Sequence, residues 1–206
     1  REHTKHILPM VDEILVQAGI TLHQVDALVF GRGPGSFTGV RIGAGIAQGL
    51  AFGAELPVIP VSNLAAMAQA AYAKYQAENV LTAIDARMNE VYFAQWQAQK
   101  VRSDFGEFLD WQPVIAEQVC SPSKVIEQVV QQHHENTVLV GTGWAAYPEL
   151  NDANLGKATE ITLPSALYML DLALPKWFAG ETISPLEIEP IYLRNEVTWK
   201  KLPGRE

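Results

Sequence analysis

The sequence is poor in cysteine and in charge, and each shortage restricts what the protein does. Cys120 is the single cysteine among 206 residues, so no internal disulfide forms, and we expect a reducing compartment and a structural, half-buried thiol. Charged residues make up only 18% of the chain, and 15 basic against 23 acidic residues give a net charge of −8. This sign argues against a broad RNA-binding surface, so any RNA contact is expected to be local or shared with a partner.

Long apolar runs are also missing. No stretch approaches the roughly 20 uninterrupted apolar residues of a membrane span, and no positively charged leader precedes an apolar segment. We therefore expect a cytoplasmic protein without a membrane anchor. The sequence begins with Arg1 rather than methionine, and a helical pattern starts almost at once, so we expect a fragment of a longer chain.

What is present fits a folded α/β protein, because 48% of the residues are hydrophobic and can bury a sizeable core. The hydrophobic pattern predicts helices at residues 5–18, 38–52, 63–75, 123–134 and 165–178, and strands at residues 27–30, 57–61, 80–86, 91–97, 114–119 and 137–140. Such alternation of strands and helices is typical of α/β folds. Residues 101–111 are the least regular and are expected to form an exposed loop. A second lobe is predicted to begin at residue 79, giving lobes of residues 1–78 and 79–206.

A glycine-rich loop follows the first predicted strand and precedes a helix, where backbone amides can approach a phosphate. A Walker loop requires lysine and then serine or threonine after its last glycine, but Val40 and Arg41 follow Gly39. A dinucleotide fold matches only loosely, because it requires an acidic residue after the next strand, where Ser62 and Asn63 stand. The sequence therefore gives little support to a phosphate site in this loop.

Ser36 in the same loop is a weaker candidate still. A nucleophilic serine of the hydrolase type has glycines two residues to either side, and Pro34 and Thr38 occupy those positions. The alternative is that the glycines and prolines of this loop make a tight turn and let the helix lie close to its neighbours.

Small residues recur at every fourth position of the helix that follows the loop. One row contains Gly39, Gly43, Ala47 and Ala51, and a second contains Gly45, Gly49 and Gly53. Each interior glycine costs about 1 kcal/mol of helix stability relative to alanine, so Gly43, Gly45 and Gly49 together cost about 3 kcal/mol. Close contact over a small-residue groove offsets such a cost by dispersion. We therefore favour a protein interface over a ligand site.

The segment from Gly33 to Gly43, followed by Gly49-Leu50-Ala51, resembles the signature segment of the TsaB family. Further matching segments follow in the order of that family, at residues 3–9, 84–87 with 90–92, and 190–194. The resemblance implies a two-lobed fold similar to actin and the sugar kinases. Because that fold opens with strands that carry an acidic phosphate loop, the first lobe here is expected to lack its N-terminal strands, about 25 to 30 residues.

The resemblance also implies a non-catalytic scaffold subunit of the bacterial complex that attaches threonylcarbamoyl to an adenosine of transfer RNA. Such a subunit binds the related catalytic transferase, TsaD, meets the ATPase TsaE through the complex, and contacts tRNA only indirectly. No catalytic residue, metal site or cofactor is then expected in this chain. The alternative is a self-contained nucleotide-binding enzyme of the actin-like superfamily, an ATPase or kinase, which would need an acidic phosphate loop and a metal-anchoring carboxylate.

Apolar and small residues on two helices are the predicted partner interface. They are Ile7, Met10, Val11, Ile14, Gly39, Gly43, Ala47 and Ala51. Because the first lobe keeps only two strands, its exposed faces and unpaired strand edge are expected to make the isolated chain a homodimer.

Three residues of the second lobe form a candidate vestigial nucleotide site. Asp85 stands where a nucleotide-binding relative has a phosphate loop, and Gly141 and Gly143 have the position of an adenosine loop. Each has a structural alternative. Asp85 is equally suited to accept hydrogen bonds in a turn, with Arg87 as its partner, and the glycines suit a strand-to-helix turn ahead of Trp144.

Overall fold

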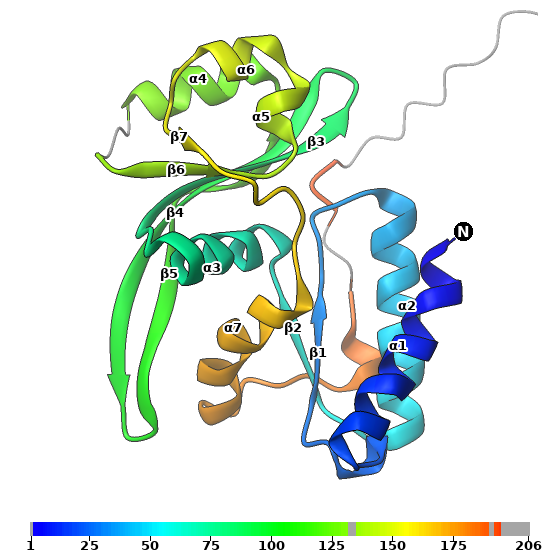
Figure 1. Ribbon diagram of the computed structural model, residues 1–206. Helices are drawn as coiled ribbons and strands as arrows, with labels where there is room; N and C mark the ends of the chain where they lie inside the picture. Colours follow the sequence, from blue (N-terminus) through cyan, green and yellow to red (C-terminus); the bar gives the residue numbers. More distant parts are fainter. Residues whose placement is uncertain (1, 132–134, 190–191, 195–206) are drawn as a thin grey trace, which may run out of the picture.

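The computed structural model describes residues 2–131, 135–189 and 192–194. Figure 1 shows two separate β-sheets with helices packed around them. The helices are α1 (Glu2–Ala18), α2 (Phe37–Ala54), α3 (Asn63–Tyr75), α4 (Pro122–Gln131), α5 (Gly143–Ala146), α6 (Pro148–Asp152) and α7 (Ala166–Phe178), with 3₁₀ turns η1 (Leu22–Gln24) and η2 (Pro185–Glu187). The strands are β1 (Leu28–Gly31), β2 (Val58–Val61), β3 (Asn79–Arg87), β4 (Glu90–Ser103), β5 (Gly106–Cys120), β6 (Thr137–Val140) and β7 (Lys157–Ala158). The predicted α/β class is confirmed.

The smaller sheet consists of β1 and β2, which run parallel with Leu28 opposite Val58. The helix α2 connects them, as a parallel pair requires a crossover. Its start is fixed by Ser36, whose hydroxyl accepts a hydrogen bond from the Gly39 N–H, and it ends at Glu55 in the left-handed conformation. The glycine loop and the helix therefore form one capped strand–turn–helix unit.

The last helix, α7, returns to the smaller sheet and contacts both of its strands and α3. After α7, Ile183 exchanges two backbone hydrogen bonds with Val58 of β2, both of 2.9 Å. The turn η2 then lies against α2. The segment from α7 to η2 therefore packs on the first half of the molecule, although the predicted division into residues 1–78 and 79–206 assigns it to the second lobe.

The larger sheet has the strand order β5-β4-β3-β6-β7. Strands β3, β4 and β5 are antiparallel neighbours, whereas β6 pairs in parallel with β3 and β7. The expected loop at residues 101–111 was wrong, because this stretch forms the far end of the β4–β5 hairpin, where Val101 pairs with Phe108. Its tip turns at Gly106, which has a φ of +128°. Because both faces of this ribbon are exposed, its sequence lacks the alternation of apolar and polar residues that marks a half-buried strand.

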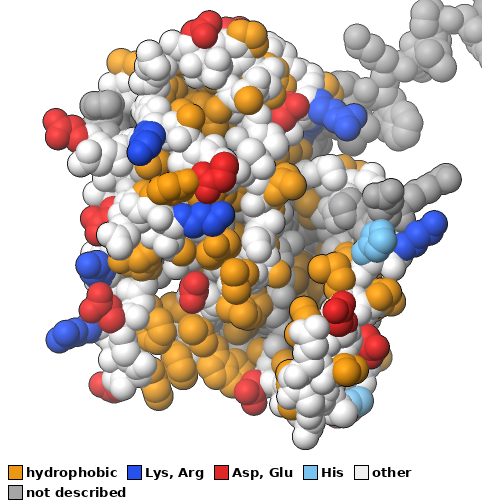
Figure 2. All heavy atoms as spheres, in the orientation of Figure 1, with side chains coloured by type: hydrophobic (Ala, Val, Ile, Leu, Met, Phe, Trp, Pro, Cys, Tyr) orange, Lys and Arg blue, Asp and Glu red, His pale blue; other side chains and the backbone are white. Residues whose placement is uncertain are grey.

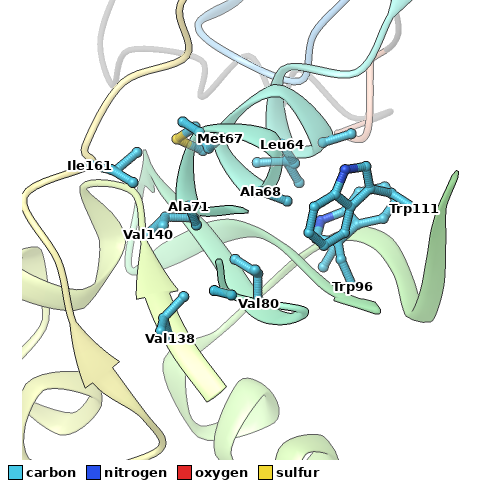
Figure 3. Close-up of a cluster of buried hydrophobic side chains, with 14 residues drawn as sticks. Leu64, Met67, Ala68, Ala71, Val80, Trp96, Trp111, Val138, Val140 and Ile161 are labelled. Carbon is cyan, nitrogen blue, oxygen red and sulfur yellow. The ribbon is translucent and has the colours of Figure 1, made fainter. Parts of the chain in front are cut away.

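The alanine-rich helix α3 lies between the two sheets and carries much of the core. Figure 3 shows its residues Leu64, Met67 and Ala68 facing Val80 of β3 and the indoles of the β4–β5 hairpin. Both indole N–H groups are satisfied. Trp96 donates to the Thr82 hydroxyl at 3.0 Å, and Trp111 donates to Oε1 of Gln69 at 2.9 Å. These contacts join α3 of the first half to the larger sheet.

Cys120, the last residue of β5, is buried in the core that α4 covers. Burial and the nearby charge of Glu90 raise the pKa of its thiol to about 11, so it stays protonated at neutral pH. The expectation of a structural thiol is confirmed, although the residue is more deeply buried than expected.

Candidate partner interface

The glycine loop is tied to the start of α3 rather than open toward a ligand. The carbonyl of Gly33 accepts from the Asn63 N–H at 3.0 Å, and that of Pro34 accepts from the Asn63 side-chain amide at 3.1 Å. Gly33 itself has a φ of +102° and is buried. At the start of α2 the Gly39 N–H already donates to Ser36. The loop is therefore a tight turn, as its structural interpretation predicted.

The two small-residue rows of α2 face different surroundings. Ala47 and Ala51 are buried against the smaller sheet together with Phe30 and Val58. These two alanines of the predicted partner interface lie on the side of α2 that faces β1 and belong to the core of the chain itself. A sequence row at intervals of four winds slowly around a helix, so one row passes from the surface into the core.

The remaining glycines of α2 leave its outer side bare. A Cβ atom added at Gly43, Gly45, Gly49 or Gly53 would have no neighbour within 4 Å. Gly39 differs, because a Cβ there would lie 2.7 Å from the Ser36 hydroxyl of its own cap. The described part of the chain therefore provides nothing that offsets the cost of the other glycines.

The helix α1 lies beside α2 (Figure 1). Of the predicted interface residues on α1, Ile7 and Val11 are half-buried, whereas Met10 is 58% exposed and Ile14 62% exposed. Within the described residues, no side chain of α1 enters a core cluster. Large apolar side chains exposed on or beside these two helices are Leu8, Met10, Ile14, Val16, Phe37 and Phe52.

Asp85 of β3 acts within the turn that joins β3 to β4. One of its carboxylate oxygens accepts from the Arg87 N–H at 2.9 Å and from the Tyr147 hydroxyl at 2.7 Å. Its own N–H donates to the Thr142 hydroxyl at 3.0 Å. Burial, and then this bond to Asp85, raise the pKa of Tyr147, which keeps the phenol a donor. The turn-acceptor interpretation of Asp85 agrees with this geometry.

Gly141 and Gly143 lie close against β3. A Cβ at Gly141 would lie 2.0 Å from the carbonyl oxygen of Ala83, and one at Gly143 would lie 2.9 Å from the Ala83 Cβ. Gly141 also has a φ of +104°. Close packing of this turn on β3 requires glycine at both positions, which favours the strand-to-helix turn over the predicted adenosine loop.

The structure also brings together three segments of the family signature that are distant in sequence. Tyr192 lies against Phe37 at the start of α2, with ring centroids 5.1 Å apart, and Arg194 bonds to Glu90 in the β3–β4 turn. Residues 190 and 191 of the last segment lie outside the described residues. The sequence identified these segments, but it did not predict that they contact one another.

A hollow of about 710 Å³ between the β4–β5 hairpin and α7 was not predicted from the sequence. The Phe105 ring at the hairpin tip stacks on Phe178 at the end of α7, with centroids 4.3 Å apart. Lys176 lies in the wall and donates to the Pro60 carbonyl at 3.2 Å, and burial lowers its pKa. Figure 2 shows hydrophobic side chains gathered around this part of the surface. The far end of the hairpin, which the sequence pattern did not predict, forms one wall of this hollow.

Two kinds of feature are absent from the described part of the chain. No group of three or more histidine, cysteine, aspartate or glutamate side chains there is placed to hold a metal ion. No helix there is long and apolar enough to cross a membrane.

Comparison with known proteins gives consistent matches. Residues 1–175 match the model of the family TsaD, tRNA N6-adenosine threonylcarbamoyltransferase. The tRNA threonylcarbamoyladenosine biosynthesis protein TsaB of Haemophilus influenzae is 67% identical over 206 residues, which are 100% of this chain and 86% of that protein. TsaB of Escherichia coli is 50% identical, over 100% of this chain and 87% of that protein.

A solved structure also matches, namely YeaZ from Pseudomonas aeruginosa. It has a TM-score of 0.81 and 39% identity, and the match covers 93% of this chain and 86% of that one. The mixed α/β fold is therefore that of a known structure, and the resemblance seen in the glycine-loop segment is confirmed over the whole chain. The chain belongs to the TsaD family and, within it, to the TsaB proteins of tRNA threonylcarbamoyladenosine biosynthesis.

Proposed function

We propose that the chain is a non-catalytic subunit that binds the catalytic transferase TsaD through the outer side of α1 and α2. The observation that carries the proposal is the bare glycine surface of α2, together with the exposed side chains of Met10 and Ile14 on the neighbouring helix α1. Exposed apolar side chains next to a helix that admits close approach are what a protein partner buries. The interface then contains Gly43 and the outer glycines, while Ala47 and Ala51 support it from the core.

Binding to TsaD also implies the fold type, the further partners and the compartment of the chain. The two sheets are then the two lobes of an actin-like fold, and α7 with η2 belongs to the first of them. The ATPase TsaE joins through the complex, tRNA is contacted only indirectly, and the site of action is the cytoplasm. The net charge of −8 supports a subunit that leaves the RNA contact to its partner.

The second candidate function, a self-contained ATPase or kinase, is less well supported. Asp85 is the carboxylate that such an enzyme would use, and it is bonded to the Arg87 N–H and to Tyr147. The glycines that would receive the adenosine are packed directly against β3, so that a Cβ atom at either of them would lie within 3 Å of Ala83. Asp85 nevertheless lies at the turn between two strands, so substituting it tests the enzyme alternative directly.

The test is turnover by the purified chain. Alone, it is expected neither to hydrolyse ATP nor to form threonylcarbamoyladenosine on tRNA, because the described residues provide no complete phosphate or metal site. Adding the catalytic transferase, TsaE and the threonylcarbamoyl donor should restore modification, measured by nucleoside analysis of the tRNA. Asp85→Asn is the control variant, since it keeps an acceptor for the turn and removes the charge. Turnover by the chain alone that Asp85→Asn abolishes would establish the enzyme alternative.

Self-association of the isolated chain is a separate expectation. The side chains of Met10 and Ile14 are exposed, and burying such apolar surface favours a dimer at micromolar concentration. Light scattering should give twice the mass of the 22.7 kDa chain. Ile14→Glu should shift the population toward monomer without a loss of helix content. A wild-type chain that stays monomeric across this range would show that the α1 surface is not sufficient for pairing.

A further inference from the structure

The C-terminal segment after α7 packs against α2 at several points between the middle and the first turn of the helix. We call residues 182–189 and 192–194 the strap. Near its start, Ile183 pairs with Val58 of β2, and the carbonyl of Pro185 accepts from the Gln48 side-chain amide of α2 at 3.1 Å. Ile183 and Ile188 pack on the buried alanine side of α2. The strap therefore supports α2 on the side opposite to its bare glycine surface.

Further along, the strap reaches the first turn of α2. The ring of Tyr192 lies 5.1 Å from that of Phe37, the first residue of the helix. The guanidinium of Arg41, one turn later, lies 5.3 Å from the Phe37 ring on the same helix. A ring-to-ring contact and a cation over a ring both add to local order. The orientation of this first turn thus depends on where Tyr192 is held.

Arg194 fixes the end of the strap on the larger sheet. One guanidinium nitrogen donates to the Ala86 carbonyl at 3.0 Å, and another donates to the Glu90 carboxylate at 2.9 Å. Both side chains of this ion pair are largely shielded, 24% exposed for Arg194 and 33% for Glu90. A guanidinium that makes two directed bonds in a shielded position orders a segment far better than an exposed pair does. The ion pair between Lys74 and Glu160, by contrast, is longer and more exposed.

We propose that Arg194 is a positioning residue for partner binding, which acts through Tyr192 and Phe37 on the first turn of α2. By anchoring the strap to the β3–β4 turn, it fixes the start of the helix that meets the transferase, although Arg194 itself bonds to the other sheet. This inference rests on the proposed function for its partner, but its structural part is independent of any partner. The β3–β4 turn, where Asp85 is held, then connects the two sheets instead of holding a phosphate.

The test combines hydrogen exchange of the isolated chain with binding to the catalytic transferase. In Arg194→Ala and in Tyr192→Ala, the amides of residues 39–42 should exchange about tenfold faster, because the first turn opens more often. The dissociation constant for the transferase should rise about tenfold, since apparent affinity falls with the fraction of binding-competent chain. Tyr192→Phe keeps the ring, and Lys74→Ala removes an ion pair elsewhere, so both should behave as wild type.

The possible results separate this inference from the proposed function. Unchanged exchange at residues 39–42 in Arg194→Ala would overturn the positioning role, whatever happens to binding. Faster exchange with unchanged affinity would also overturn it, because the first turn would then not matter to the partner. A general loss of folding would appear as faster exchange throughout β3 and β4, and Tyr192→Ala, which leaves the ion pair intact, then decides. If no variant of α2 affects binding, the proposed interface fails while the exchange result still stands.

Discussion

Gly43→Leu is expected to abolish stable pairing with the catalytic transferase while leaving the chain folded. A side chain at this position meets open space in the isolated chain, so it fits without repacking. Replacing an interior helical glycine even favours the helix, by about 1 kcal/mol. At a close interface, however, a leucine holds the two surfaces apart, so overpacking costs roughly 1–3 kcal/mol and the apolar surface around it stays hydrated. Size-exclusion chromatography of the mixed proteins should show two separate peaks.

Two matched variants make this result specific. Ala73→Leu places the same side chain at an exposed position of α3, away from α2, and should co-elute with the transferase as wild type does. Ala47→Leu enters the core between α2 and the smaller sheet, so it should lower the melting temperature of the chain itself. Gly49→Leu probes the outermost side of α2. Full co-elution of both Gly43→Leu and Gly49→Leu would place the interface elsewhere.

Gly141→Ala is expected to cause the largest loss of stability among single methyl additions to the described glycines. The new Cβ would lie 2.0 Å from a backbone oxygen of β3, which has no side-chain freedom to move aside. A φ of +104° adds strain for any residue with a Cβ. Strain and overlap each cost roughly 1–3 kcal/mol, so we expect a loss of about 3 kcal/mol or more. The midpoint of thermal unfolding should fall by about 10 °C.

Gly106→Ala is the control for this measurement. Gly106 has a φ of +128°, but a Cβ there meets nothing within 4 Å, so only the backbone strain remains. The difference between the two variants measures the close approach of the turn to β3. Equal losses would mean that the turn stands away from β3, and the adenosine-loop interpretation of Gly141 and Gly143 would then be restored.

Much of the fold was predictable because its signals are local. The alternation of short apolar strands and helices indicated the α/β class, and the glycine-rich loop after the first strand marked the start of the helix that follows it. The β4–β5 hairpin was missed beyond residue 97, since its far end is exposed on both faces and lacks the alternation that burial imposes. The return of α7 was also missed. A helix pattern shows which residues are apolar but not which sheet they cover.

The candidate interface was predictable in its chemistry but not in its orientation. Glycines and alanines at intervals of four indicated close contact, and only the position of β1 decides that Ala47 and Ala51 are buried whereas Gly43 is half-buried with open space beside it. Asp85 had two interpretations, and the hydrogen bonds from the Arg87 N–H and from Tyr147 favour the turn. The second of these partners is distant in sequence. Contacts of Arg194 and Tyr192 likewise depend on tertiary structure alone.

The return of α7 to the smaller sheet has a consequence for synthesis on the ribosome. Strands β1 and β2 end at Val61, but the helix that covers them ends only at Phe178, which emerges on the order of ten seconds later. A two-stranded sheet is rarely stable alone, whereas the larger sheet, from Asn79 to Ala158, is contiguous in sequence. The larger sheet can therefore fold first, and the half that carries the proposed partner surface is completed last. Nascent chains that end before α7 would expose the β1–β2 unit and require protection by chaperones.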